Sequence, residues 1–248
     1  MKQKHYYTFD KSIQAKFSEN ELNRSNWDIL RNSEDNGDFS IEKTVEAYEE
    51  NCRKQSAYAD AANIIIDMIK EKDLVPNGIV SVGVGKGILE WHIKQVCPNI
   101  RVECTDYTKE ALEKLGAVLK NVDSIQEFDM INGDYTVFPS GSIILMFRVS
   151  TEFDRKQWDA VFAKMYGAGI ENIIYVPTEV ASLRHMLSEK KNHIKNVLRG
   201  RKDTFCGWLY SENEFINMFS GKGSKPMYDI VKAVSLNDTC VYMLKMDK

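Results

Sequence analysis

The sequence has no hydrophobic run long enough to cross a membrane. Its longest apolar stretches, such as residues 143–147, contain five residues, whereas a transmembrane helix needs about 20. Residues 1–10 are polar and aromatic and contain no apolar signal core. We therefore expect no membrane partner.

Cysteine is also scarce and follows no pattern. The five cysteines are odd in number and form no C-x-x-C pair, which argues against a disulfide scaffold and against a structural zinc site. No two of the four histidines have metal-ligand spacing with a nearby acid, so we predict no metal. The reducing cytoplasm is the expected location of such a chain.

An excess of charge of either sign is absent as well. The formal net charge is −3 and the pI is about 5.9, so bulk charge does not favour nucleic-acid binding. Only five prolines and 14 glycines occur, no repeat is visible, and 43% of the residues are hydrophobic. The 248 residues therefore predict one large folded domain, or one domain with a cap.

What is present is an alternation of β-rich runs and helical patterns. The β-rich runs are residues 79–82, 101–104, 127–131, 142–149 and 172–176. Such alternation predicts parallel strands joined by crossover helices. Near the C-terminus, residues 229–236 and 240–246 are joined by Asn237-Asp238, which predicts an antiparallel hairpin. The predicted fold class is α/β, with a seven-stranded and mostly parallel sheet.

The flanking segments predict two additions to this sheet. We predict a helix over about residues 41–72, within which apolar residues between 58 and 69 recur at helical spacing. Residues 1–75 are interpreted as an N-terminal helical cap or lid. Residues 76–248 are the main domain. Within it, residues 180–205 are interpreted as a basic helical insertion, because residues 184–202 contain seven basic residues and one acid.

A glycine-rich loop follows the first β-rich run. Gly83, Gly85 and Gly87 allow a tight turn and a close approach of the backbone to a ligand. The helix that follows offers free N–H groups to an anion. Asp106 comes 19 residues after Gly87, where a carboxylate can accept hydrogen bonds from a ribose diol. The alternative is a glycine turn that only joins strand to helix.

The G-x-G-x-G spacing differs from the dinucleotide fingerprint, which would need glycine where Ile88 stands. Instead the region resembles motif I of class I S-adenosylmethionine-dependent methyltransferases, which have a three-layer Rossmann-like fold ending in a hairpin. The resemblance covers residues 79–180 by motif and implies S-adenosylmethionine as cofactor. One position departs from the family pattern: Ser81 stands where an acid usually helps to anchor the methionine amino group.

The resemblance also implies roles for individual residues. The loop glycines would hold the methionine part of the cofactor, and Asp106 would bind its ribose. Tyr107 would lie against the adenine, and Asp134 would contact the adenine amino group. An alternative stays open for each acid: Asp106 could be only a helix N-terminal acid, and Asp134 only a turn residue.

The acceptor site is expected at the carboxyl ends of the fourth and fifth strands. Methyl transfer is an in-line displacement with an activated leaving group, so the protein mainly positions the reactants. We predict Arg148, Glu152 and His185 as the catalytic residues. His193 is interpreted as a surface residue and His92 as a packing residue.

The predicted reaction is methyl transfer to an oxygen or nitrogen of a small molecule. Residues 146–150 lack the N/D-P-P-Y/F-type motif of base methylation, so no nucleic-acid partner is expected. The basic segment is either a solvated helix face or an attractor of an anionic acceptor, such as a phosphorylated or nucleotide-linked sugar. A homodimer is also considered. Two alternatives stay open: a nucleotide-dependent oxidoreductase and a non-catalytic cofactor-binding scaffold.

Overall fold

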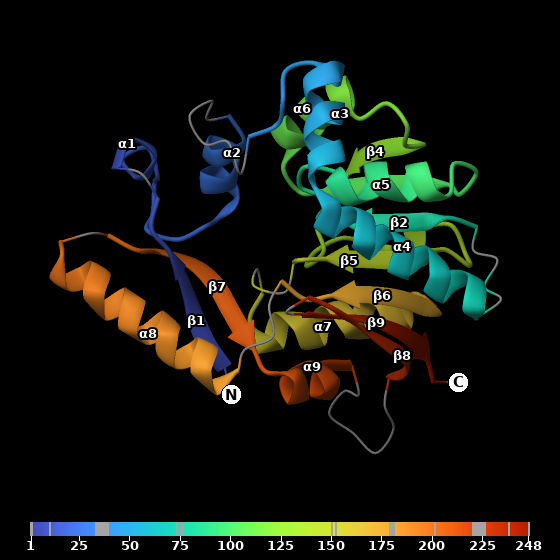
Figure 1. Cartoon of the computed structure of the whole chain (residues 1–248). Coiled ribbons are helices and arrows are strands. Elements are labelled where there is room, and N and C mark those ends of the chain that lie inside the picture. Colours follow the sequence, from blue (N-terminus) through green and yellow to red (C-terminus); the bar gives the residue numbers. More distant parts are fainter. Residues whose placement is uncertain are drawn as a thin grey trace.

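The computed structural model has a central sheet flanked by helices (Figure 1). It describes residues 2–9, 11–32, 40–72, 74, 77–149, 151, 153–178, 182–200, 202–219, 227–237 and 239–247. In chain order the elements are β1 (Lys2–Tyr7), α1 (Lys11–Gln14), α2 (Arg24–Asn32), α3 (Val45–Lys54), α4 (Ser56–Glu71), β2 (Ile79–Val82), α5 (Ile88–Val96), β3 (Val102–Asp106), α6 (Lys109–Val118), β4 (Ser124–Glu127), the 3-10 helix η1 (Tyr135–Val137), β5 (Ile143–Phe147), α7 (Arg155–Gly167), β6 (Asn172–Val176), α8 (Leu183–Leu198), β7 (Thr204–Tyr210), α9 (Glu212–Phe219), β8 (Tyr228–Leu236) and β9 (Thr239–Met246).

Seven of the described strands form the main sheet, in the order β4-β3-β2-β5-β6-β9-β8. The strands from β2 to β6 pair in parallel, whereas β9 lies antiparallel between β6 and β8. All residues of β2 and β3 are buried, as expected for parallel strands that are covered on both faces. The predicted α/β class, the mostly parallel seven-stranded sheet and the C-terminal hairpin are confirmed.

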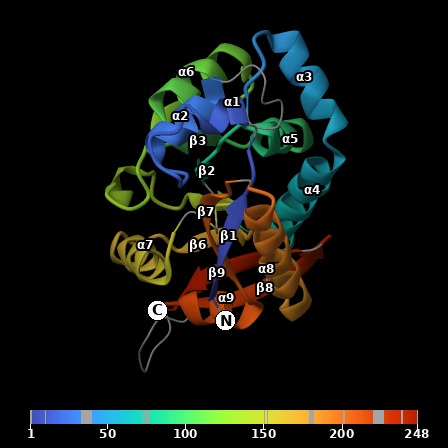
Figure 2. The ribbon, with the colours of Figure 1, turned by 90° about the vertical axis from the view of Figure 1, so that its left-hand side faces the viewer.

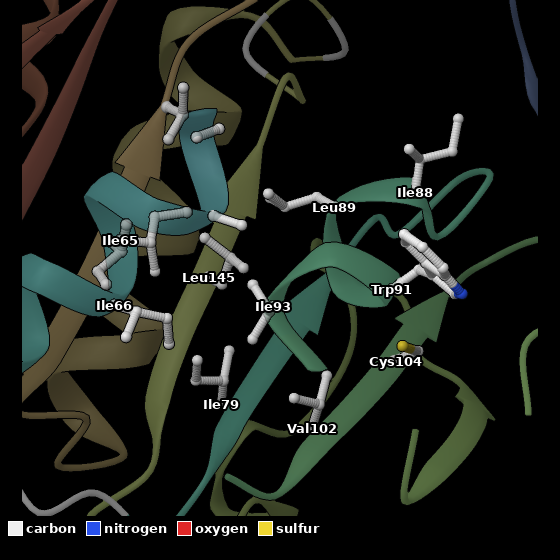
Figure 3. Close-up of a cluster of buried hydrophobic side chains, with 14 of the residues drawn as sticks. Ile65, Ile66, Ile79, Ile88, Leu89, Trp91, Ile93, Val102, Cys104 and Leu145 are labelled. Carbon is white, nitrogen blue, oxygen red and sulfur yellow. The ribbon is translucent and has the colours of Figure 1, made fainter. Parts of the chain in front are cut away.

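Side chains alternate between two hydrophobic cores on the two faces of this sheet, because successive strand residues point to opposite sides. One core joins the sheet to α4, α5 and α6; Figure 3 shows Ile93 of α5 near Ile79 of β2 and Val102 of β3. The other core joins the sheet to α7 and α9 and contains the fully buried Trp158 and Phe215. The loops that follow the parallel strands lie at the carboxyl edge of the sheet, between the two helical layers.

The structure corrects two predicted boundaries. The helix expected over residues 41–72 is two helices, α3 and α4, because Gln55 between them leaves the helical conformation at φ −95° and ψ 68°. The strand expected over residues 127–131 is β4, which ends at the start of that range. It ends there because the Asp129 carboxylate accepts two backbone N–H groups, at 2.8 and 3.1 Å, and closes a turn.

An accessory unit, consisting of β1, β7, α8, α1 and α2, lies beside the main sheet (Figures 1 and 2). In it β1 pairs antiparallel with β7, α8 packs against β1, and Ile13 and Leu30 form a small core with Phe9. The unit meets the loop after β5 where the Trp208 N–H donates to the Thr151 carbonyl at 2.9 Å. The segment interpreted as a helical cap therefore also contains a strand that the sequence did not indicate.

The division of the chain at residue 75 stays a prediction. Helix α4, which precedes it, packs into the main core through Ile65 and Ile66. Within the described ranges, no helix is both long and apolar enough to cross a membrane.

Candidate functional site

The glycine-rich loop joins the end of β2 to the start of α5. Gly83, Gly85 and Gly87 have φ values of +72°, +59° and +68°, a conformation that residues with a side chain rarely adopt. Val84 and Lys86 between them have negative φ, and such alternation turns successive backbone N–H groups toward one side. The sequence interpretation of a tight glycine turn is confirmed.

Asp106 faces this loop. Its Oδ2 accepts the Gly85 N–H at 3.0 Å, and its Oδ1 accepts the backbone N–H of Thr108 at 3.2 Å and the Thr108 hydroxyl at 2.9 Å. The residue is 7% exposed. Since each carboxylate oxygen accepts about two hydrogen bonds, Oδ1 is filled and Oδ2 can accept one more. The carboxylate therefore keeps acceptor capacity for one further hydrogen bond without releasing a present partner.

Two of the three glycines are required by the packing of the chain itself. A Cβ on Gly83 would lie 2.5 Å from Cγ1 of Val149, in the loop after β5. A Cβ on Gly87 would lie 2.7 Å from Cδ2 of Leu119 and 3.0 Å from Cδ1 of Leu115. The sequence reasoning assigned all three glycines to the approach of a ligand, and for these two the protein's own side chains supply a separate reason.

A buried polar pair lies behind the loop. The Ser81 hydroxyl donates to Oε1 of Glu90 at 2.5 Å, and the two residues are 1% and 2% exposed. Burial raises the pKa of Glu90 to about 7, although the Ser81 hydrogen bond acts in the opposite direction. Sequence reasoning noted the missing acid at position 81 but not Glu90. The available signal was a carboxylate at a core-facing position in the first turn of α5.

Contacts from the N-terminal part hold the loop on its other side. The Tyr48 hydroxyl donates to the Lys86 carbonyl at 2.8 Å, and the Lys86 ammonium lies 3.2 Å from Oε1 of Glu42. His92, on α5, lies 2.9 Å through Nε2 from the Cys52 carbonyl and is buried, in agreement with its packing interpretation. Burial raises the pKa of Tyr48 well above its usual range, so this hydroxyl stays a proton donor.

The other predicted cofactor residues lie in different surroundings. Tyr107 is half-buried and directly follows Asp106 at the end of β3. Asp134 is exposed and caps η1, where its carboxylate accepts the Thr136 N–H at 2.9 Å and the Thr136 hydroxyl at 2.7 Å. These hydrogen bonds lower the pKa of Asp134. This geometry is that of the turn alternative, and an adenine contact of Asp134 stays a prediction.

The three predicted catalytic residues are placed to different extents. Glu152 lies outside the described residues, and His185 lies on α8. Arg148 directly follows β5, is exposed, and has a left-handed backbone with φ +57°. Its backbone N–H donates to the Val176 carbonyl at 2.8 Å, and its backbone carbonyl accepts the Thr178 hydroxyl at 2.7 Å. Arg148 thus lies where β5 and β6 end, as predicted.

A further group of polar residues lies in the accessory unit. Nδ1 of His193, on α8, lies 2.8 Å from Oδ2 of Asp203, whose side chain is 3% exposed. The Thr8 hydroxyl donates to Oδ1 of Asp203 at 2.5 Å. The His193 ring stacks on Tyr6 of β1, with 4.4 Å between the ring centroids. Sequence reasoning assigned His193 to the surface, and its side chain is 38% exposed. The stack on Tyr6, from the other end of the chain, was not predicted.

Metal ligands do not gather in the part of the chain that the structure describes. There, no group of three or more His, Cys, Asp or Glu side chains could hold a metal ion.

Comparisons with known proteins place the fold. No family model matches the chain, and no curated protein matches it. Human N-acetylserotonin methyltransferase (ASMT), solved with S-adenosylmethionine (SAM), is similar with a TM-score of 0.60 and 10% identity, over 93% of this chain and 64% of the human one. Magnesium protoporphyrin IX methyltransferase (ChlM) from Synechocystis PCC 6803, solved with S-adenosylhomocysteine (SAH), is similar with a TM-score of 0.55 and 11% identity, over 78% of this chain and 85% of ChlM.

A similar structure is also found for a protein that is not described as a methyltransferase. A Rhodobacter sphaeroides structure described as a Zn-dependent alcohol dehydrogenase is similar with a TM-score of 0.52 and 12% identity, over 71% of this chain and 87% of that one. Because all three identities are low, these likenesses establish the fold alone. The chain has the Rossmann-like fold found in class I methyltransferases.

Proposed function

We propose that the chain is an S-adenosylmethionine-dependent methyltransferase that acts on an oxygen or nitrogen of a small molecule. The observation that carries the proposal is the buried Asp106 carboxylate held against the glycine-rich loop. The chain shares its fold with proteins that were solved with SAM or SAH. A terminal hairpin inserted antiparallel into the sheet supports the same assignment.

The residues at the loop fit the adenosyl part of this cofactor. Asp106 would bind a ribose hydroxyl through the remaining acceptor capacity of Oδ2. Gly83, Gly85 and Gly87 would lie along the methionine part, and Tyr107 and Asp134 would contact the adenine. Ser81 is turned into the core by its bond to Glu90, so the amino group of the methionine part would need another partner.

The bound cofactor would supply a methyl group on a positively charged sulfonium, which departs as a neutral thioether and needs no further activation. The chain's own residues would then orient the acceptor and exclude water. Arg148, exposed where β5 and β6 end, would attract an anionic acceptor. Glu152 and His185 are proposed to act on the proton of the acceptor, and residues 1–75 to cover the site. An anionic small-molecule acceptor and a homodimer are parts of the proposal.

The test is cofactor binding followed by turnover. Calorimetry should give saturable binding of SAH to the full chain, and Asp106→Asn should weaken this binding by about 1–3 kcal/mol. In that variant an NH2 group replaces Oδ2, so it opposes the Gly85 N–H and cannot accept a hydrogen bond from the ribose. The matched control is Asp123→Asn, which also accepts a backbone N–H, from Val102 at 2.8 Å, but at the start of β3.

Each outcome separates one alternative. An unchanged dissociation constant in Asp106→Asn removes this residue from the site. NADH binding without SAH binding favours the nucleotide-dependent oxidoreductase instead. SAM binding without formation of SAH, across oxygen and nitrogen acceptors, favours the non-catalytic scaffold.

A further inference from the structure

A cavity of about 430 Å³ lies in the accessory unit, between β1 and the inward side of α8. Its lining includes Tyr6, Thr8, His193 and Asp203, the polar group described above, together with Lys195 of α8 and Arg199 directly after this helix. Nothing in the proposed cofactor site uses these residues. The composition of the cavity therefore needs its own explanation.

Helix α8 places its apolar residues outward and its polar residues toward this cavity. Leu187, Ile194 and Leu198 are 61%, 59% and 82% exposed, the reverse of the usual arrangement for a helix on a protein surface. On the inward side, the Asn196 amide donates to the Thr8 hydroxyl at 3.0 Å and to Oδ1 of Asp203 at 3.2 Å. These hydrogen bonds satisfy the polar groups on this side of the helix and fix their positions.

The carboxylates at the cavity already have partners. Asp203 accepts from Thr8 and Asn196 and lies beside His193. Glu189, which also lines the cavity, lies 3.0 Å through Oε1 from Nδ1 of His5. These contacts occupy acceptor positions of both acids, and in the described ranges neither acid forms a salt bridge with Lys195 or Arg199.

Two cationic side chains of the cavity lining, Lys195 and Arg199, have no carboxylate partner in the described ranges. Arg199 directly follows α8, and its backbone N–H donates to the Lys195 carbonyl at 3.2 Å, so the two residues lie one turn apart on the same side. Neither forms a salt bridge with any residue in the described ranges. These two cations suit an oxyanion.

We propose that this cavity binds the phosphate group of a phosphorylated small molecule. Lys195 and Arg199 pair with the phosphate oxygens, since a guanidinium matches the geometry of a phosphate and an ammonium adds a point charge. The Tyr6 ring, stacked on His193, forms an aromatic wall for the organic part. The proposal rests on the proposed function in one respect, since the anionic acceptor would be this ligand, but phosphate binding itself needs no cofactor.

The experiment is calorimetric titration of the full chain with phenyl phosphate, and with phenol as the uncharged analogue. Phenyl phosphate should bind saturably and phenol should not. The double variant Lys195→Gln with Arg199→Gln should weaken phenyl phosphate binding at least about tenfold, because it removes both charge-assisted contacts. The control is Lys190→Gln with Lys191→Gln, which removes the same charge from α8 at exposed positions outside the cavity.

The control should lose less than about threefold, as expected for loss of general attraction between exposed charges. Equal weakening in both double variants, or no saturable binding to the unaltered chain, would overturn the proposal. Thermal unfolding shows that each variant is folded, and SAH titration runs in parallel. Phenyl phosphate binding in a chain that does not bind SAH supports the cavity and removes only the proposed methyl transfer.

Discussion

Glu90 should make the unfolding free energy of this protein depend on pH. Its pKa is about 7 in the folded chain, against an ordinary value of 4.5, because the carboxylate is buried among apolar side chains behind the glycine-rich loop. Between these two values the folded state binds the proton and the unfolded state does not. The contribution of Glu90 to stability is therefore highest below pH 4.5, falls as the pH rises toward 7, and levels off above that. The gap between the values corresponds to about 3 kcal/mol.

The variant Glu90→Gln removes this titration while it keeps an acceptor for the Ser81 hydroxyl. We expect it to be about as stable as the parent chain near pH 4.5, and more stable by up to about 3 kcal/mol near pH 8. Urea unfolding at both pH values measures the difference. Glu46→Gln is the matched control, since Glu46 also lies in the first turn of its helix but is exposed.

Two results would refute this reasoning. An equal gain at both pH values would mean that the amide only packs better than the carboxyl group. A loss of stability near pH 8 would mean that the ionised carboxylate is stabilised by its surroundings, in which case burial does not control its pKa.

Two further predictions concern the backbone near the loop. Gly83→Ala should lower the free energy of unfolding by about 2–4 kcal/mol, because it forces a side chain into a left-handed conformation and against Val149. In urea unfolding, adding Val149→Ala should recover part of this loss, whereas additive losses in the double variant would contradict the contact. Arg148→Val should cost about 1–2 kcal/mol, whereas Arg148→Gly should be close to neutral, because the left-handed backbone disfavours branched side chains; equal melting temperatures for the two variants would contradict the role of the backbone.

The main sheet was largely predictable from the sequence because its central strands are short, apolar and separated by helices. The run at residues 172–176 matches β6 residue for residue. Strand β4 was misplaced because its sequence Ser-Ile-Gln-Glu, at the edge of the sheet, has three polar residues out of four and little apolar signal. The break at Gln55 was missed because the apolar spacing continues from α3 into α4.

The candidate site was predictable only where its residues follow from local sequence. The three glycines and Asp106 lie at the ends of two neighbouring strands, and parallel pairing brings those ends together. The stack of His193 on Tyr6 depends on how α8 packs against β1, which sequence periodicity does not encode. Burial of Glu90 was missed for a similar reason, since a charged residue in an apolar pattern is ordinarily assigned to the surface.

The ladder between β1 and β7 has a consequence for how the chain folds. Lys2 pairs with Tyr210, so this ladder closes a loop of about 200 residues, and contacts between residues so distant in sequence form slowly. During synthesis, β1 stays without its partner until residues 204–210 have emerged from the ribosome. The accessory unit is therefore expected to be the last part to assemble, after the central sheet provides the surface on which it docks.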